Sequence, residues 1–306
     1  MQIAGLNCPV IKFQNSPMIS VLQLGILDYA TGLRLQQKLV GLRKEGRIGD
    51  VLLLLEHTPV ITLGRNAVAA NVIASPELLA QRGVEVFECD RGGDVTFHGP
   101  GQIVGYPIFD LHGFPSNDLK RKTLGVVEYV RRLEEVLIRT CADFAIPTKR
   151  IAGLTGVWTD PNSLSSRAEA NDSLANRSLE SRDLLSDVRS QNSSEAKIAA
   201  LGVHVSRGVT SHGFAFNVNS DLSFFNLIIP CGITAKPVTS MQQELGKQMD
   251  LQEIAHSISR NFGAVFASQI LWLETLEALL GQTVGAPLQT PRELRQFHKE
   301  DGTTWA

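Results

Sequence analysis

The strongest constraint on the fold is a glycine-rich stretch, RGGDVTFHGPGQIVGY, at residues 91–106. Glycine adopts backbone conformations that other residues avoid and lets a ligand approach the main chain, at a cost in conformational entropy. Glycines clustered beside Arg91, Thr96 and His98 therefore indicate a binding loop. A glycine-rich hairpin between two strands explains these residues equally well when the stretch is taken alone. The glycines concerned are Gly92, Gly93, Gly99 and Gly101.

Composition and charge predict a soluble chain with a sizeable core. The 306 residues are 43% hydrophobic and 20% charged, which suits one large domain or two small ones. A formal net charge of −2 gives no electrostatic footprint for nucleic acid or an anionic membrane. No apolar run approaches the ~18 residues of a membrane span, and no secretory signal opens the chain. We therefore expect a cytoplasmic protein.

Cofactor motifs are missing from the sequence. The stretch at 91–106 is neither a GxxxxGK[ST] loop nor a GxGxxG turn that opens a helix, so a nucleotide site of those classes is not expected. The histidines form no HExxH, and the scattered cysteines form no CxxC. We expect no metal, no cofactor and no disulfide framework, which fits a reducing compartment. The cysteines are Cys8, Cys89, Cys141 and Cys231.

Strands and helices are expected to interleave without a regular βαβ repeat. Alternating or short apolar runs predict strands at 19–24, 51–55, 60–63, 84–88, 102–109, 154–158, 198–206 and 213–218. Capping residues predict helix starts at Asp28, Ser75, Asn117 or Asp118, Ser240 and Asp250. This order predicts a single α/β (α+β) domain with a mixed sheet flanked by helices.

Some connections are predicted more specifically. Residues 102–109 are expected to return from the glycine-rich stretch that follows strand 84–88. A turn containing Gly208 and His212 is expected to join 198–206 to 213–218. The helix after Asp250 is expected to be the last. The helix after Asn117 or Asp118 should carry its apolar residues on one face, namely Val126, Val130, Leu133, Leu137 and Phe144.

The domain is expected at residues 19–281, between an N-terminal arm at 1–18 and a C-terminal tail at 282–306. Residues 161–195 interrupt it. They are rich in Ser, Asn, Asp, Glu and Arg and contain no aromatic residue. Such a segment buries too little apolar surface to offset its ordering entropy. We interpret it as a disordered insertion within the domain.

Cys231 and Lys197 are candidates for covalent chemistry. Cys231 lies in a Pro-Cys-Gly turn after an apolar run, and Lys197 lies near the start of the run AKIAALGV. A nearby cation lowers a thiol pKa and favours the nucleophilic thiolate. Taken singly, Cys231 also fits a small buried hydrophobic residue and Lys197 a solvated strand end. The residues alone leave both alternatives open.

Three motifs follow one another along the chain: RGGDVTFHGPGQIVGYP at 91–107, KIAALGVHVSRGVTSHGFAFNV at 197–218 and PCGI at 230–233. Together they resemble the lipoyl(octanoyl) transferase family. DYATGLRLQQKLV at 28–40 and LLLLEHTPVITLGR at 52–65 match the same family. The resemblance covers most of 19–266 and implies the fold shared by biotin and lipoate ligases.

The resemblance implies an octanoyltransferase that uses a cysteine thioester intermediate. It assigns Cys231 as the nucleophile and Lys197 as the residue that lowers the thiol pKa and shuttles protons, with backbone amides near Gly92, Gly93 or Gly232 facing the oxyanion. Because the thioester donor is already activated, neither ATP nor a metal is needed. The implied substrate-binding residues are Arg91, Gly92, Gly93, Asp94, Val95, Thr96, Phe97, His98, Ala200, Leu201, Gly202, Gly213, Phe214 and Ala215.

The implied partners are octanoyl-acyl carrier protein as donor and apo lipoyl domains as acceptors. The acceptors would be those of 2-oxo acid dehydrogenase complexes and the glycine cleavage H protein, and the enzyme is expected to be a monomer. The chain departs from the family at the insertion and at Phe97, where Tyr is frequent. Two alternatives remain: an ATP-dependent lipoate or biotin ligase, and a non-catalytic module that docks carrier or lipoyl domains.

Overall fold

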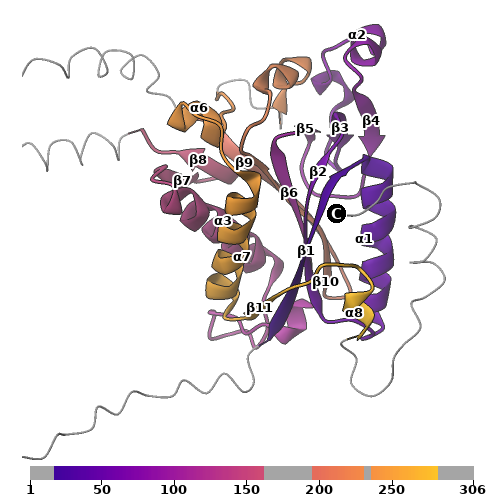
Figure 1. Ribbon diagram of the computed structural model, residues 1–306, viewed down its shortest axis with the longest axis vertical. Helices are drawn as coiled ribbons and strands as arrows, with labels where there is room; N and C mark the ends of the chain where they lie inside the picture. Colours follow the sequence, from indigo (N-terminus) through magenta and orange to yellow (C-terminus); the bar gives the residue numbers. More distant parts are fainter. Residues whose placement is uncertain (1–16, 162–194, 231–235, 282–306) are drawn as a thin grey trace, which may run out of the picture.

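Two β-sheets and the helices around them make up the computed structural model, which describes residues 17–161, 195–230 and 236–281 (Figure 1). Most of the expected arm, most of the insertion, the tail and Cys231 lie outside these residues. The larger sheet contains β1 (Met18–Leu27), β2 (Asp50–His57), β6 (Gln102–Ile108), β7 (Thr148–Ile151), β8 (Leu154–Thr159), β9 (Lys197–Ser206), β10 (Val209–Asn217) and β11 (Gln269–Trp272). The smaller sheet contains β3 (Val60–Leu63), β4 (Glu85–Glu88) and β5 (Val95–His98).

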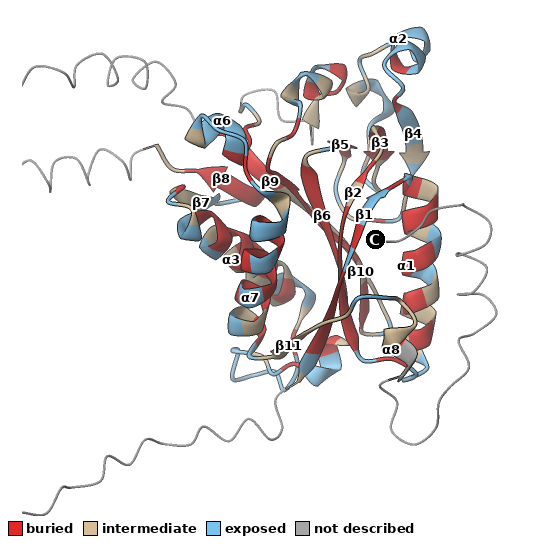
Figure 2. Cartoon of the chain, in the orientation of Figure 1, coloured by how far each residue is buried: buried red, intermediate tan, exposed pale blue. Residues whose placement is uncertain are grey.

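The larger sheet is mixed, as the sequence predicts. Its strand order is β11-β1-β2-β6-β10-β9-β8-β7. The pairs β11–β1 and β1–β2 are parallel, whereas the pairs from β2–β6 through β8–β7 are antiparallel. The central strands β2, β6 and β10 are buried along almost their whole length (Figure 2).

Helices cover both faces of the larger sheet, which explains why the run Leu52–Leu55 does not alternate with polar residues. On one face, α1 (Tyr29–Lys44) packs Leu35 and Leu39 into a core with Leu53 and Leu55. On the other face, α3 (Val126–Asp143) and α7 (Leu251–Phe266) form a second core that includes Leu52 and Leu54 (Figure 1). Shorter helices are α2 (Pro76–Gln81), α6 (Met241–Leu245) and α8 (Ala278–Gly281), with 3-10 turns η1 (Ala69–Asn71), η2 (Leu111–Gly113) and η3 (Leu222–Leu227).

Four of the five expected helix caps are confirmed. The Asp28 carboxylate accepts a hydrogen bond from Thr31 N at 2.8 Å and begins α1. Ser75, Ser240 and Asp250 cap α2, α6 and α7 in the same way. These caps could be predicted because each depends on residues within one helical turn.

The expected start of α3 is wrong. Its N-cap is Gly125, which makes no side-chain hydrogen bond, and Val126 is exposed. Glu128 explains the difference, since its carboxylate accepts hydrogen bonds from Asn117 N at 2.9 Å and Ser116 Oγ at 2.6 Å. The segment around Asn117 therefore folds back against the first turn of α3 instead of entering the helix.

The expected return of 102–109 alongside 84–88 is also wrong. β4 pairs with β3 in the small sheet, whereas β6 lies between β2 and β10 in the large one. Within the glycine-rich stretch, residues 95–98 form β5, which pairs antiparallel with β3. The stretch thus carries the chain from one sheet into the other.

Three further differences concern the sheet. The turn between β9 and β10 is at Arg207 and Gly208, and His212 lies inside β10 rather than in the turn. The edge strands β7 and β11, of four residues each, were not expected. β11 and α8 follow α7, so the helix after Asp250 is not the last element.

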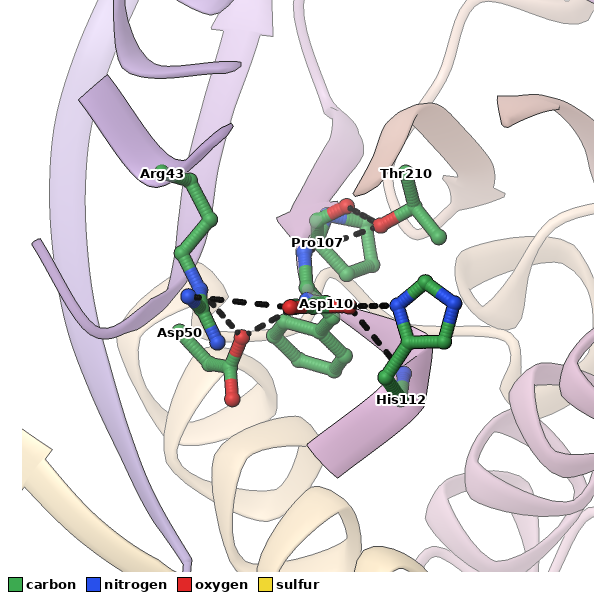
Figure 3. A network of polar contacts seen from close by, with 7 residues as sticks. Arg43, Asp50, Pro107, Asp110, His112 and Thr210 are labelled. Carbon is green, nitrogen blue, oxygen red and sulfur yellow. Dashed lines mark hydrogen bonds and ion pairs between the residues drawn. The ribbon is translucent and has the colours of Figure 1, made fainter. Parts of the chain in front are cut away.

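A polar network ties the sheet to α1 at the ends of β2, β6 and α1 (Figure 3). Asp50 at the start of β2 accepts from Arg43 Nε at 2.9 Å and from Asp110 N at 2.8 Å. The Thr210 hydroxyl donates to Pro107 O at 2.7 Å.

Among the described residues, no helix is long and apolar enough to cross a membrane.

Candidate active site

A pocket with about 470 Å³ of empty space lies where the glycine-rich stretch meets the large sheet; we call it the central pocket. It is lined by residues of α1, β5, β6, β9, β10 and the loop before β5. Ten of the predicted substrate-binding residues line it, namely Arg91, Gly93, Thr96, His98, Ala200, Leu201, Gly202, Gly213, Phe214 and Ala215. The wall is mainly apolar with a few converging polar groups, as is typical of small-molecule sites.

The other four predicted residues do not line the central pocket. Alternation along β5 directs Thr96 and His98 to the pocket and places Val95 and Phe97 in a separate core. Phe97 stacks there on Phe224, with ring centres 4.7 Å apart, so it is not in position to contact a ligand in the pocket.

Gly92 and Asp94 hold the loop in place. Gly92 N donates to Val203 O at 3.0 Å, which occupies one of the amides suggested for the oxyanion. The Asp94 carboxylate accepts from Val68 N at 3.0 Å and from Asn71 Nδ2 at 2.5 Å. Both residues therefore support the shape of the site.

Arg91 places a buried cation in the pocket wall. Its guanidinium donates to Thr62 O at 2.7 Å and to Asp94 O at 2.8 Å, and it also bonds the Thr62 hydroxyl. Arg91 is only 8% exposed. Carbonyl groups of β3 and of the loop before β5 thus hold the charge at the pocket.

His98 is fixed as a neutral ring by a chain of hydrogen bonds. Gln102 Nε2 donates to Phe97 O at 3.1 Å and to Asn217 Oδ1 at 2.9 Å, so its Oε1 faces His98 Nδ1 at 2.8 Å. This arrangement assigns the proton to Nδ1 and leaves Nε2 to accept from the Thr62 hydroxyl at 3.3 Å. Burial, with the nearby charges of His57 and Arg91, lowers the pKa of His98 to about 3.

Four pocket residues were not among those predicted: Tyr29, Val104, Tyr106 and His212. Tyr106 donates its hydroxyl to His57 Nε2 at 2.6 Å, while His57 Nδ1 donates to Leu27 O at 3.0 Å. Burial lowers the pKa of His57 to about 4. All four pocket residues lie in stretches that match the family: Tyr29 in 28–40, Val104 and Tyr106 in 91–107, and His212 in 197–218.

Lys197 lies in a smaller pocket that adjoins the central one; we call it the lysine pocket. Thr96, Ala200 and Ala215 line both pockets. Lys197 is only 6% exposed and lies over the ring of Trp158, which excludes a solvated strand end. Pro230 also lines the lysine pocket. Cys231, the next residue, lies outside the described residues.

Metal ligands do not gather anywhere in residues 17–161, 195–230 or 236–281. No group of three His, Cys, Asp or Glu side chains there is arranged to hold a metal ion. The polar groups of the central pocket are instead a cation, neutral histidines and hydroxyls, which suit hydrogen bonding to an uncharged or anionic group.

Known proteins resemble this chain over most of its length. Residues 28–263 match the family described as lipoyl protein ligase A/B catalytic domain. An octanoyltransferase of Koribacter versatilis is 55% identical over 284 residues, which cover 93% of this chain and 98% of that protein. An octanoyltransferase of Acidobacterium capsulatum is 51% identical, covering 86% of this chain and 96% of its own.

Solved structures show the same fold. The bi-partite lipoate protein ligase of Thermoplasma acidophilum has a TM-score of 0.57 at 15% identity, covering 86% of this chain and 91% of its own. A lipoate-protein ligase A bound with ATP has a TM-score of 0.56 at 15% identity, covering 94% of this chain and 98% of its own. The lipoate-ligase fold implied by the sequence motifs is therefore confirmed.

Proposed function

The chain belongs to the lipoyl protein ligase A/B catalytic domain family, and on that premise we propose that it transfers an octanoyl group from a carrier thioester to a lysine of a lipoyl domain. Its curated relatives of 51–55% identity are octanoyltransferases, and this chain is accordingly an acyltransferase. The observation that carries the proposal is that a mainly apolar pocket adjoins a second pocket that contains a buried lysine. The central pocket suits an acyl chain, and the adjoining pocket contains Lys197 next to Pro230.

The proposed first half-reaction forms an acyl-enzyme. The Cys231 thiolate attacks the thioester carbonyl of octanoyl-acyl carrier protein, and the bond between the carbonyl carbon and the carrier sulfur breaks. The carrier thiol leaves with a proton supplied by Lys197. The octanoyl chain then lies in the central pocket, against apolar groups such as Val104 and Ala215.

The second half-reaction forms an amide. The ε-amine of the acceptor lysine attacks the acyl-enzyme carbonyl, the Cys231 sulfur leaves, and Lys197 accepts the proton that the amine loses. Because one thioester is exchanged for another before the amide forms, the reaction needs no ATP. Backbone amides near Gly93 and Gly232 are the remaining candidates for stabilising the oxyanion.

The partners we propose are octanoyl-acyl carrier protein, the lipoyl domains of 2-oxo acid dehydrogenase complexes and the glycine cleavage H protein. We place the enzyme in the cytoplasm and expect it to act as a monomer. These assignments rest on the family resemblance and on the cysteine pattern of the sequence.

Mass spectrometry of the intact enzyme after incubation with octanoyl-acyl carrier protein tests the proposal. We expect one octanoyl adduct on Cys231, its loss in Cys231→Ser, and its transfer to added apo lipoyl domain. Cys89→Ser is the matched control and should keep the adduct, because Cys89 Sγ is engaged with Leu63 O at 3.3 Å. Transfer that survives in Cys231→Ala and requires ATP would instead establish a ligase.

A further inference from the structure

His212 separates the central pocket from a second cleft. This cleft, which we call the hairpin cleft, lies between α1 and the end of the β9–β10 hairpin and has about 830 Å³ of empty space, part of it open to solvent. Among the described residues, His212 is the one that lines both spaces. Beyond it the walls become polar, with Gln37, Lys44 and Ser206 among them.

The side chain of His212 faces the α1 side of the sheet, although the alternation of side chains along β10 would direct it to the opposite side. Phe214 and Phe216, at even positions of the same strand, belong to the core under α3 and α7. His212 instead packs its ring edge-on to Tyr106, with centres 6.5 Å apart, on the α1 side. Its left-handed backbone, with φ of +54°, accounts for the reversal.

Two hydrogen bonds hold His212 in this position. Its Nε2 lies 2.7 Å from Asp90 Oδ1, and its backbone N donates to Gln36 Oε1 at 2.8 Å. The residue is only 3% exposed. A left-handed residue other than glycine costs conformational energy and persists where its surroundings fix it, often at functional sites.

We propose that the His212 ring, held by Asp90, is the end wall of the acyl pocket and sets the longest acyl chain that the enzyme accepts. The inference deepens the proposed function and rests on it. Along β10, Ala215 lines both the lysine pocket and the central pocket, and His212 lies three residues earlier on the same strand. At the rise of a strand, this separation is about 10 Å. A chain that enters beside Lys197 and runs along β10 therefore meets the imidazole end-on.

Removing the ring should join the central pocket to the hairpin cleft. His212→Gly is the best variant because glycine adopts a left-handed backbone without strain. We expect wild type to prefer octanoyl- over dodecanoyl-acyl carrier protein in kcat/KM for transfer to apo lipoyl domain. In His212→Gly, the dodecanoyl-to-octanoyl ratio should rise about tenfold or more.

Matched variants distinguish a wall from other roles. His204 approaches Asp90 at 3.6 Å but lines only the hairpin cleft, so His204→Ala should leave the ratio unchanged. His212→Gln fills similar space, can donate to Asp90 and should keep the octanoyl preference. A histidine that acted by proton transfer would not tolerate glutamine.

The inference is overturned if the wild-type enzyme transfers octanoyl groups and His212→Gly has the same dodecanoyl-to-octanoyl ratio as wild type. Wild type that transfers no octanoyl group would overturn the proposed function and the inference with it. Should thermal melting show that His212→Gly is unfolded, Asp90→Ala takes its place, because the Asp90 side chain is 53% exposed. Asp90→Ala removes the hydrogen bond that holds the His212 ring, so the dodecanoyl-to-octanoyl ratio should rise in this variant too. An unchanged ratio would contradict the role of His212 as the end wall of the pocket.

Discussion

The ammonium of Lys197 lies 4.8 Å from the centre of the Trp158 ring, within the range of a cation–π interaction. Trp158 is buried, and among the described residues its indole Nε1 finds no hydrogen-bond acceptor. The ring thus holds Lys197 through its face rather than through its polar edge. This contact places the amine in the lysine pocket.

Replacing either member of this pair should slow octanoyl transfer. Lys197→Met removes the proposed proton shuttle, and we expect a loss of about 10²- to 10⁴-fold in rate. Trp158→Leu removes the ring face that positions the amine, and the loss should be about 3- to 30-fold. Single-turnover transfer from octanoyl-acyl carrier protein measures both.

Two variants serve as controls for that prediction. Trp158→Phe leaves a similar void but keeps an aromatic face, so it should stay within about threefold of wild type. Lys236 lies 5.8 Å from the same ring and forms an ion pair with Glu195, outside the lysine pocket. Lys236→Met should therefore transfer nearly normally. Equal losses in Trp158→Phe and Trp158→Leu would show that packing, not the ring face, is what matters.

Sequence reasoning succeeded where the signal is local. The start of α1 is encoded by Asp28 and by leucines at helical spacing, and the cap of α7 by Asp250, all within a few residues. It failed where the position of a strand depends on its pairing with segments distant in the sequence. β6 lies beside β2 and β10, and nothing in residues 102–109 records that choice. Strand partners are set by burial of both faces of the sheet.

The same distinction holds for the candidate site. Residues 200–202 and 213–215 reach the central pocket because the pairing of β9 with β10 aligns them, and the motif carried that information. Phe97 was expected in the pocket but lies behind it, because a strand directs neighbours to opposite faces. His212 could not be placed in advance, since a left-handed residue within a strand has no local signature except in glycine.

Asp50 should matter for stability rather than for chemistry. Asp50→Ala leaves Asp110 N without its acceptor and the largely buried Arg43 with only the longer contact to Asp110 at 4.0 Å, and we expect the free energy of unfolding to fall by about 2 to 4 kcal/mol. Urea denaturation measures this. Glu45→Ala breaks the exposed ion pair with Arg47 nearby and should change stability by less than about 1 kcal/mol. Comparable effects of the two variants would contradict the structural role of Asp50.

Acid should destabilise the fold through its buried histidines. The pKa values of His98 and His57 are lowered by burial to about 3 and about 4, from 6.5. The unfolded chain therefore binds protons at these groups before the folded chain does. Their contribution to stability is complete above pH 6.5 and is lost as pH falls from there towards 4. Each group contributes a slope of up to about 1.4 kcal/mol per pH unit.

Urea titrations at pH 7.5, 6.5, 5.5 and 5.0 measure that slope. His98→Gln should reduce it, because one buried group no longer takes up a proton on unfolding. His112→Gln, at a side chain that is 66% exposed, should leave the slope as in wild type. Stability that stays constant from pH 7.5 to 5.0 would mean that the two rings do not resist protonation in the folded state.

The insertion should be replaceable by a short linker. Lys149 pairs with Asp160 at 3.1 Å and with Glu195 at 2.8 Å, and Thr159 N donates to Ala196 O at 2.9 Å. The two ends of the segment are therefore held side by side, and a few residues suffice to join them. Shortening a loop changes its closure free energy only slowly with length. Replacing 163–193 with a short Gly/Ser linker should leave the melting temperature and octanoyl transfer close to wild type. A severe loss of transfer with purified partners, at an unchanged melting temperature, would instead assign residues 163–193 a part in the reaction.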